Sequence, residues 1–221
     1  MNAFDIIGPV MVGPSSSHTA GAARLGYAGR MLLGEMPREA QITLSGSFAD
    51  TGKGHGTDKA VIAGLMGMQP DDENIPYSLE LAKSRQMQYC FQMHNLSHTY
   101  SNFLQMDLKG ESGNTVTLQG ASVGGGSIGI TEINKIAIAL TCENNTIVVI
   151  HKDDIGVIAK LTGIVASHEV NIAAIRCTRN EKGQEAITGI EVDGSISMKC
   201  IDEIYSIPSV KKCIYLKMAG E

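Results

Sequence analysis

The chain has 221 residues, 43% of them hydrophobic and 19% charged, enough for one large core or two modest ones, and we expect two domains. The net charge of -5 argues against nucleic acid as a partner, because binding a phosphate backbone needs a basic surface. Residues 1 to 11 lack a basic start with a long apolar run, and no later stretch approaches the roughly 20 apolar residues of a membrane helix. We expect a cytoplasmic protein with a small-molecule ligand and no membrane partner.

Two polar clusters framed by glycine mark the N-terminal part. The first, GPSSSHT at residues 13 to 19, precedes small and apolar residues at helical spacing, so its serines predict the N-cap of a helix over about 17 to 34 that Pro37 ends. A strand at 41 to 47 leads into the second cluster, TGKGHGTD at 51 to 58, which we interpret as a glycine loop before a helix at about 57 to 68. Such a strand, loop and helix can hold an anion against backbone amides.

The rest of the N-terminal part predicts one more helix and several strands. A helix is expected over 78 to 92, and strands over 103 to 108, 115 to 118, 128 to 133 and 136 to 142. Glu143 and the two asparagines after it form the most polar break in the second half of the chain. We therefore expect an α/β domain over residues 1–143 and a second domain over 146–221.

The second domain has a compact order of predicted elements. Strands at 146 to 152, 170 to 179, 185 to 193 and 210 to 218 alternate with helices at 157 to 169 and 198 to 207, which gives the order βαββαβ. This order predicts a ferredoxin-like, α+β arrangement, a four-stranded sheet with two helices on one face. The core-facing stripe of the first helix is expected to be Val157, Ile158, Leu161, Ile164 and Val165.

The five cysteines, at 90, 142, 177, 200 and 213, have no close pair. Such spacing is typical neither of a disulfide framework nor of zinc or ferredoxin-type ligands, so no metal is expected on this chain. Free cysteines in apolar segments usually pack as small core residues. A zinc site built from His18, His55 and Asp58 is a minor alternative, because imidazole and carboxylate suit zinc.

The C-terminal domain resembles the ACT domain, a regulatory fold that binds amino acids. The likeness lies in residues 154 to 159 (DIGVIA), where an acidic residue and a glycine open the first helix, and in residues 170 to 172 (VNI). It implies that Asp154, Gly156 and Asn171 bind an effector, or that the domain serves in assembly by homodimerisation of two sheet edges.

The N-terminal domain resembles the β subunit of iron–sulfur-dependent L-serine dehydratase. Three segments carry the likeness: GPSSSHTAGAAR at 13 to 24, GSFADTGKGHGTDKA at 46 to 60 and SVGGGSI at 122 to 128. It implies an allosteric-substrate-binding-like fold and a partner, the α subunit, whose cysteines ligate a [4Fe–4S] cluster. This chain alone is then expected to be inactive.

The resemblance implies elimination of water from L-serine to give pyruvate and ammonia, with an iron of the cluster acting as Lewis acid on the hydroxyl. A base must remove the α-proton, and histidine has the pKa suited to this. We expect His55 as base, Lys53 opposite the carboxylate and Asp58 orienting the imidazole or the ammonium, although the base could equally come from the α subunit. The other expected site residues are His18, counted with the catalytic group, and the substrate-binding Ser15, Ser16, Ser17, Thr19 and Thr57.

Two other functions are weighed beside this one. The chain could be a free-standing amino-acid sensor, in which the N-terminal clusters bind the ligand without a cysteine-rich partner. A hydrolase with Ser16 and a histidine as nucleophile and base is the weaker reading, because no Gly-x-Ser-x-Gly turn is present.

Overall fold

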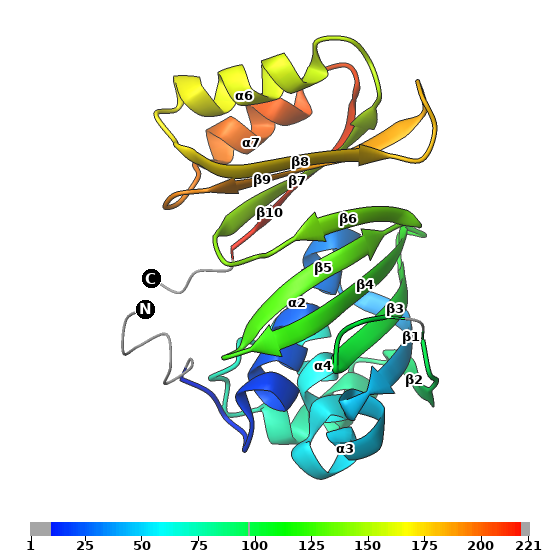
Figure 1. The fold of residues 1–221 in the computed structure, drawn as a ribbon. Helices are drawn as coiled ribbons and strands as arrows, with labels where there is room; N and C mark the ends of the chain where they lie inside the picture. The colour runs from blue at the N-terminus through cyan, green and yellow to red at the C-terminus, as the bar shows by residue number, and fades with distance from the viewer. Residues whose placement is uncertain (1–9, 97, 218–221) are drawn as a thin grey trace. The chain divides into compact units, whose positions relative to one another are not determined.

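The computed structural model describes residues 10–96 and 98–217, and it divides the chain into two compact units between Asn134 and Lys135 (Figure 1). Both units mix helices and strands, as expected for an α+β protein. The division lies before the expected break at residues 143 to 146. The reason is strand β6 (Ile136–Leu140), which packs within the second unit: Leu140 lies against Gly189 of strand β9.

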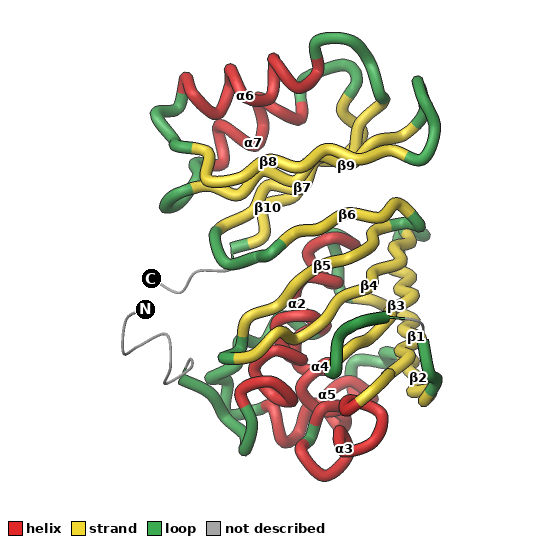
Figure 2. Tube along the Cα trace, in the orientation of Figure 1, coloured by secondary structure: helices red, strands yellow, loops and turns green. Residues whose placement is uncertain are grey.

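The first unit is a mixed sheet with helices packed against it (Figures 1 and 2). Its strands β2 (Gln88–Met93), β1 (Pro37–Gly46), β3 (Asn102–Gly110), β4 (Thr115–Gly124) and β5 (Ser127–Ile133) lie side by side in that order. Only the β1–β2 pair is parallel among the neighbouring pairs β1–β2, β1–β3, β3–β4 and β4–β5. The helical elements are η1 (Ser16–Gly21), α2 (Ala22–Leu33), α3 (Ser47–His55), α4 (Thr57–Leu65), η2 (Ile75–Tyr77) and α5 (Ser78–Ser84).

Two expectations for this unit were wrong. The second glycine cluster is not a loop, because residues 47 to 55 form helix α3 between Gly46 and Gly56, both at positive φ, with Phe48 fully buried beneath it. The helix expected over 78 to 92 ends at Ser84, and Gln86 takes φ 59°. Residues 88 to 93 form strand β2 instead, because they pair with β1 along the edge of the sheet.

Helices α2 and α4 approach each other closely because glycines face both backbones. A Cβ on Gly26 would overlap the carbonyl of Val61, and a Cβ on Gly64 would overlap the carbonyl of Ala23. Helix α4 is almost wholly apolar or small, and its residues Ala60 to Leu65 are all buried. This pairing holds the start of α4, and with it the end of α3, against the rest of the unit.

We expect Gly64→Ala to destabilise the first unit by about 3 kcal/mol, because the new methyl group meets backbone that has no room to move. Gly163→Ala is the matched control: it also lies within a helix, with no atom within 4 Å of the added Cβ, and should stabilise its unit by about 0.5–1 kcal/mol. Urea unfolding of both variants measures the difference. Equal effects of the two substitutions would contradict the close packing of α2 on α4.

The second unit has the expected βαββαβ order and the expected sheet. Strands β10 (Val210–Leu216), β7 (Asn145–Lys152), β9 (Glu185–Val192) and β8 (Ile172–Arg179) form an antiparallel sheet in that order. Its core joins this sheet to α6 (Val157–Ser167) and α7 (Met198–Tyr205). Of the predicted stripe on α6, Val157, Leu161 and Val165 are buried and Ile164 packs beside them, whereas Ile158 is exposed.

Candidate functional site

The first polar cluster forms a short π-helix, η1, with a serine at its start. Ser15 is the N-cap, as predicted, and its Oγ accepts a hydrogen bond of 3.1 Å from the backbone amide of His18. A π-helix is rare and often marks a functional site. Because Ser15 caps η1, the backbone of His18 is fixed in the first turn of this helix.

The two clusters meet through the ring of His18. Its Nε2 lies 3.1 Å from the Oγ of Ser47 and 3.0 Å from the Oγ1 of Thr51, both on helix α3. The rings of His18 and His55 are 4.9 Å apart between centroids. The hydroxyl of Thr19 donates a hydrogen bond of 3.3 Å to the carbonyl of His55. The histidines at positions 18 and 55, 37 residues apart in the chain, thus form one imidazole pair.

The environment of His55 fixes its tautomer. Its Nδ1 lies 3.0 Å from the carbonyl oxygen of Thr51, one helical turn earlier. A carbonyl oxygen only accepts, so Nδ1 carries the proton when the ring is neutral, and Nε2 keeps a basic lone pair. His55 is therefore oriented by the helix backbone and presents one basic nitrogen.

The pKa of His18 is lowered below 6.5, mainly because burial penalises its charged form, with a smaller contribution from the neighbouring His55. A hydrogen bond with the Ser47 backbone acts in the opposite direction. At neutral pH the ring of His18 is therefore uncharged, and it neither repels a cationic amino group nor supplies a positive charge.

We expect an NMR titration of the histidine rings to give His18 a midpoint below 6.5. The unfolded chain takes up this proton near pH 6.5 and the folded chain only at lower pH, so His18 reduces the free energy of unfolding as pH falls through that window. His18→Gln should remove this part of the pH dependence. A midpoint at or above 6.5 would contradict the burial argument.

A cavity of about 280 Å³ lies beside His55, near the lower end of the size of small-molecule sites. Two lysines, Lys53 and Lys59, supply positive charge, and an apolar wall comes from Ile75 and Pro76. The remaining lining residues come from the two glycine-framed clusters and the residue before the first: Val12, Gly13, Pro14, Thr19, Gly54, His55 and Gly56. The cavity thus combines cations, a basic imidazole and exposed glycine backbone, a set that suits the carboxylate of a small acid or amino acid.

Several predicted residues lie elsewhere than expected. Asp58 is half-buried, and the hydrogen bond that its carboxylate accepts is from the backbone amide of Lys59, 2.8 Å away, whereas His55 is oriented by Thr51. Thr57 is fully buried against Gly52 and does not line the cavity, and its hydroxyl has no hydrogen-bond partner among the described residues. Ser16 and Ser17 are half-buried within η1.

The sequence interpretation missed Ser47, Thr51 and Lys59. Ser47 and Thr51 stand four residues apart, on one face of a helix. A loop over these residues would not place the two hydroxyls on a common face, whereas helix α3 does. Lys59 lies four residues after His55, on helix α4, and it is less exposed than Lys53.

The effector residues predicted in the second unit each have their own contacts within the described residues. Asn171 lines a groove beside α6 with Thr162 and Gly163, and its amide donates a hydrogen bond of 2.7 Å to Asp193. Asp154 forms an ion pair of 3.0 Å with Lys152. Gly156, at φ 84°, is the N-cap of α6.

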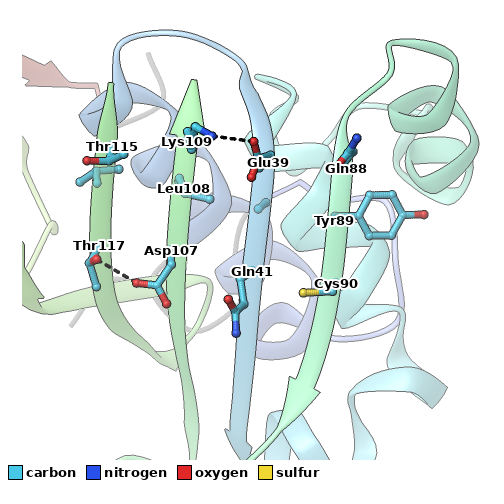
Figure 3. Close-up of a pocket in the computed structure, with 12 residues that line it drawn as sticks. Glu39, Gln41, Gln88, Tyr89, Cys90, Asp107, Leu108, Lys109, Thr115 and Thr117 are labelled. Atoms are coloured by element: carbon cyan, nitrogen blue, oxygen red, sulfur yellow. Dashed lines mark hydrogen bonds and ion pairs between the residues drawn. The ribbon is translucent and has the colours of Figure 1, made fainter. Parts of the chain in front are cut away.

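Other features of the described residues bear on cofactors and ligands. Within residues 10–96 and 98–217, no three His, Cys, Asp or Glu side chains come together to hold a metal ion, and no helix is long and apolar enough to cross a membrane. Burial raises the pKa of the Cys213 thiol to about 12. A second cavity, of about 500 Å³, lies on the sheet of the first unit, where Lys109 pairs with Glu39 and Thr117 donates to Asp107 (Figure 3).

Comparison with known proteins gives matches over nearly the whole chain. A family model described as serine dehydratase beta chain matches residues 2–133, and one described as an AHAS small subunit-like ACT domain matches residues 147–212. The chain is 39% identical over 207 residues to the probable L-serine dehydratase, beta chain, of Bacillus subtilis (strain 168), covering 94% of each chain.

Two further relatives differ in how they are built. The L-serine dehydratase, beta chain, of Peptoniphilus asaccharolyticus is 33% identical over 218 residues, 98% of each chain. L-serine dehydratase TdcG of Escherichia coli (strain K12) is 39% identical over 92 residues, which are 37% of this chain and only 19% of that one. TdcG therefore carries a similar segment within a much longer polypeptide.

Proposed function

The chain belongs to the serine dehydratase beta chain family, and we propose that it completes the active site of an L-serine dehydratase whose α subunit carries a [4Fe–4S] cluster. The enzyme removes water and then ammonia from L-serine, and pyruvate is the product. The observation that supports this role best is His55, which lines a cavity together with two lysines and has the ring of His18 beside it, 4.9 Å away between centroids.

The charges at the cavity fit an amino-acid substrate. Lys59 and Lys53 would bind the carboxylate of L-serine, because ammonium and carboxylate form strong charge-assisted hydrogen bonds. His18 is neutral at physiological pH because burial lowers its pKa, so its ring does not repel the ammonium group of the substrate. Its contacts with Ser47 and Thr51 make it a positioning group for helix α3.

His55 would act as the base. Its Nε2 takes the proton from the α-carbon and the electron pair of that bond forms the double bond to the β-carbon. The C–O bond breaks, and the hydroxide leaves as water with the proton that His55 gives up. The resulting aminoacrylate becomes an imine, and water then releases ammonia and gives pyruvate. The backbone carbonyl of Thr51, 3.0 Å from Nδ1, holds the neutral ring in the required tautomer and accepts from Nδ1 also after Nε2 is protonated.

The residues of this chain do not fit the cluster itself, because the described cysteines are dispersed. Cys142 and Cys200 are buried while Cys90 and Cys177 are exposed, and no group of three possible ligands is present within the described residues. We therefore assign the cluster to the α subunit, where it would polarise the substrate hydroxyl. The free thiols agree with a reducing compartment, and we place the enzyme in the cytoplasm.

For the second unit we propose assembly and effector binding at the β8 edge. Strand β8 ends the four-stranded sheet, and the groove lined by Asn171 runs beside it. Such an edge pairs readily with the same edge of a second copy. Sedimentation of the chain with and without L-serine, together with calorimetry, tests both parts: a monomer that gives no heat at millimolar serine would refute them.

The direct experiment is recovery of the chain from its source cells without oxygen, followed by a pyruvate assay with L-serine. A brown, cysteine-rich partner that arrives with pyruvate-forming activity supports the proposed function. A single clean protein that binds L-serine without turnover would instead establish an amino-acid sensor.

A further inference from the structure

The hairpin between β4 and β5 lies at the same end of the sheet as the candidate site. Gly46, which precedes helix α3, pairs with Asn102 of β3, Asn102 pairs with Ser122 of β4, and Ser122 pairs with Ile128 of β5. These residues form one row across four strands. The three glycines that follow Ser122 and Val123 therefore lie at the same end of the sheet as the segment that carries Ser47 and Thr51, with strand β3 between β1 and β4.

The backbone of this hairpin is unusual in its use of glycine. Gly124, Gly125 and Gly126 all have positive φ, at 109°, 59° and 82°. Gly124 pairs with Ser127, so the turn itself consists of two residues, for which glycine at both positions is sufficient. The third glycine belongs to a register shift between Ser122 and Gly124, an irregularity of the kind that often adjoins functional sites.

Residues of η1 and α2 contact the hairpin at Ser122 and Gly126, whereas Val123 and Gly124 are open to solvent. Arg24, on the helix that continues from η1, donates a hydrogen bond of 2.9 Å from Nη1 to the carbonyl of Gly126, and burial lowers the pKa of its guanidinium. Ser122 is 3% exposed and lies against Gly21 of η1, where a Cβ would overlap it. By contrast, no atom lies within 4 Å of a Cβ placed on Gly124, and Val123 is 52% exposed.

We propose that this hairpin, residues 122 to 127, is the surface on which the α subunit docks, with Arg24 as the residue that positions it. The inference rests on the proposed function. On the proposed function the site needs a second polypeptide, and three observations favour the hairpin as the place where it docks. Ser122 lies against Gly21 of η1, the helix that carries His18, the space around Gly124 is open, and the exposed Val123 stands beside it.

The test uses the full chain and separately purified α subunit, with the dissociation constant as readout. Val123→Asp should weaken binding at least tenfold, because the complex would then bury a charged side chain where the wild type buries an apolar one. Thr115→Asp, at the opposite end of the same strand and also exposed, is the control and should leave the constant unchanged. Thermal unfolding of each variant confirms that the fold is intact.

A second variant tests the role of Arg24. Arg24→Met should speed amide hydrogen exchange at Gly125 to Ser127 and weaken binding of the α subunit. Arg24→Lys should keep part of the protection from exchange and part of the affinity. Equal binding of Val123→Asp and wild type would overturn the inference. Failure of the wild-type chain to bind α at all would refute the proposed function, on which the inference depends.

Discussion

His55→Gln in the assembled enzyme is expected to lower kcat for L-serine by about 10²–10⁴-fold, the usual contribution of a positioned general base. Glutamine has a similar size and polarity, so the fold and the cavity are retained, but it cannot accept a proton at neutral pH. KM should change little, because the two lysines that bind the carboxylate remain. Steady-state pyruvate formation with matched amounts of α subunit measures both constants.

The matched control for this substitution is His94→Gln. His94 is exposed and follows strand β2, away from the lining of the cavity, and its replacement should leave kcat unchanged. Exchange of the α-proton of L-serine with deuterated solvent gives an independent readout of the base. If His55→Gln kept full kcat, the base would belong to the α subunit, and His55 would be only a neighbour of the substrate.

Lys59→Met is expected to raise KM for L-serine about 10- to 100-fold with kcat nearly unchanged. A hydrogen bond to a charged group is worth about 1.5–3 kcal/mol, and the half-buried ammonium of Lys59 is screened less by water than that of exposed Lys53. Methionine keeps the length and apolar body of the side chain. Lys53→Met should therefore raise KM by a smaller factor.

Lys83→Met serves as the control for both lysine variants, because Lys83 lies in helix α5 and does not line the cavity. D-serine and L-threonine, tested with each variant, show whether the carboxylate contact is general. A larger rise in KM for Lys53→Met than for Lys59→Met would make Lys53 the stronger contact of the carboxylate. An unchanged KM in both variants would contradict binding of the carboxylate by these lysines.

The sequence predicts the second unit better than the first. Alternating strands and amphipathic helices in βαββαβ order define the ferredoxin-like sheet. On α6 the predicted core stripe differs from the structure at Ile158, an apolar residue that is exposed. In the first unit, glycines misled the interpretation. Gly52 and Gly54 lie inside helix α3, where capping by Gly46 and Gly56 and burial of Phe48 outweigh their low helix propensity.

The composition of the site could be predicted, but its geometry could not. Both clusters were singled out from their residue types, and the structure places His18 beside His55. The partners of the two rings depend on α3 being helical, since only then do Ser47 and Thr51 share a face and the Thr51 carbonyl reach His55. A role for Asp58 was expected from its place three residues after His55, but Gly56, at φ 70°, separates α3 from α4, and the carboxylate of Asp58 accepts a hydrogen bond from the amide of Lys59.

The central claim is that this chain supplies part of a shared active site, and titration of the two subunits tests it most directly. Purified α subunit, with its cluster intact, is mixed anaerobically with increasing amounts of this chain, and pyruvate from L-serine is followed. We expect no turnover by either protein alone, and a rate that rises and saturates at a fixed ratio of the two. Full activity of the α subunit without this chain would contradict a shared site and leave this chain a regulatory role.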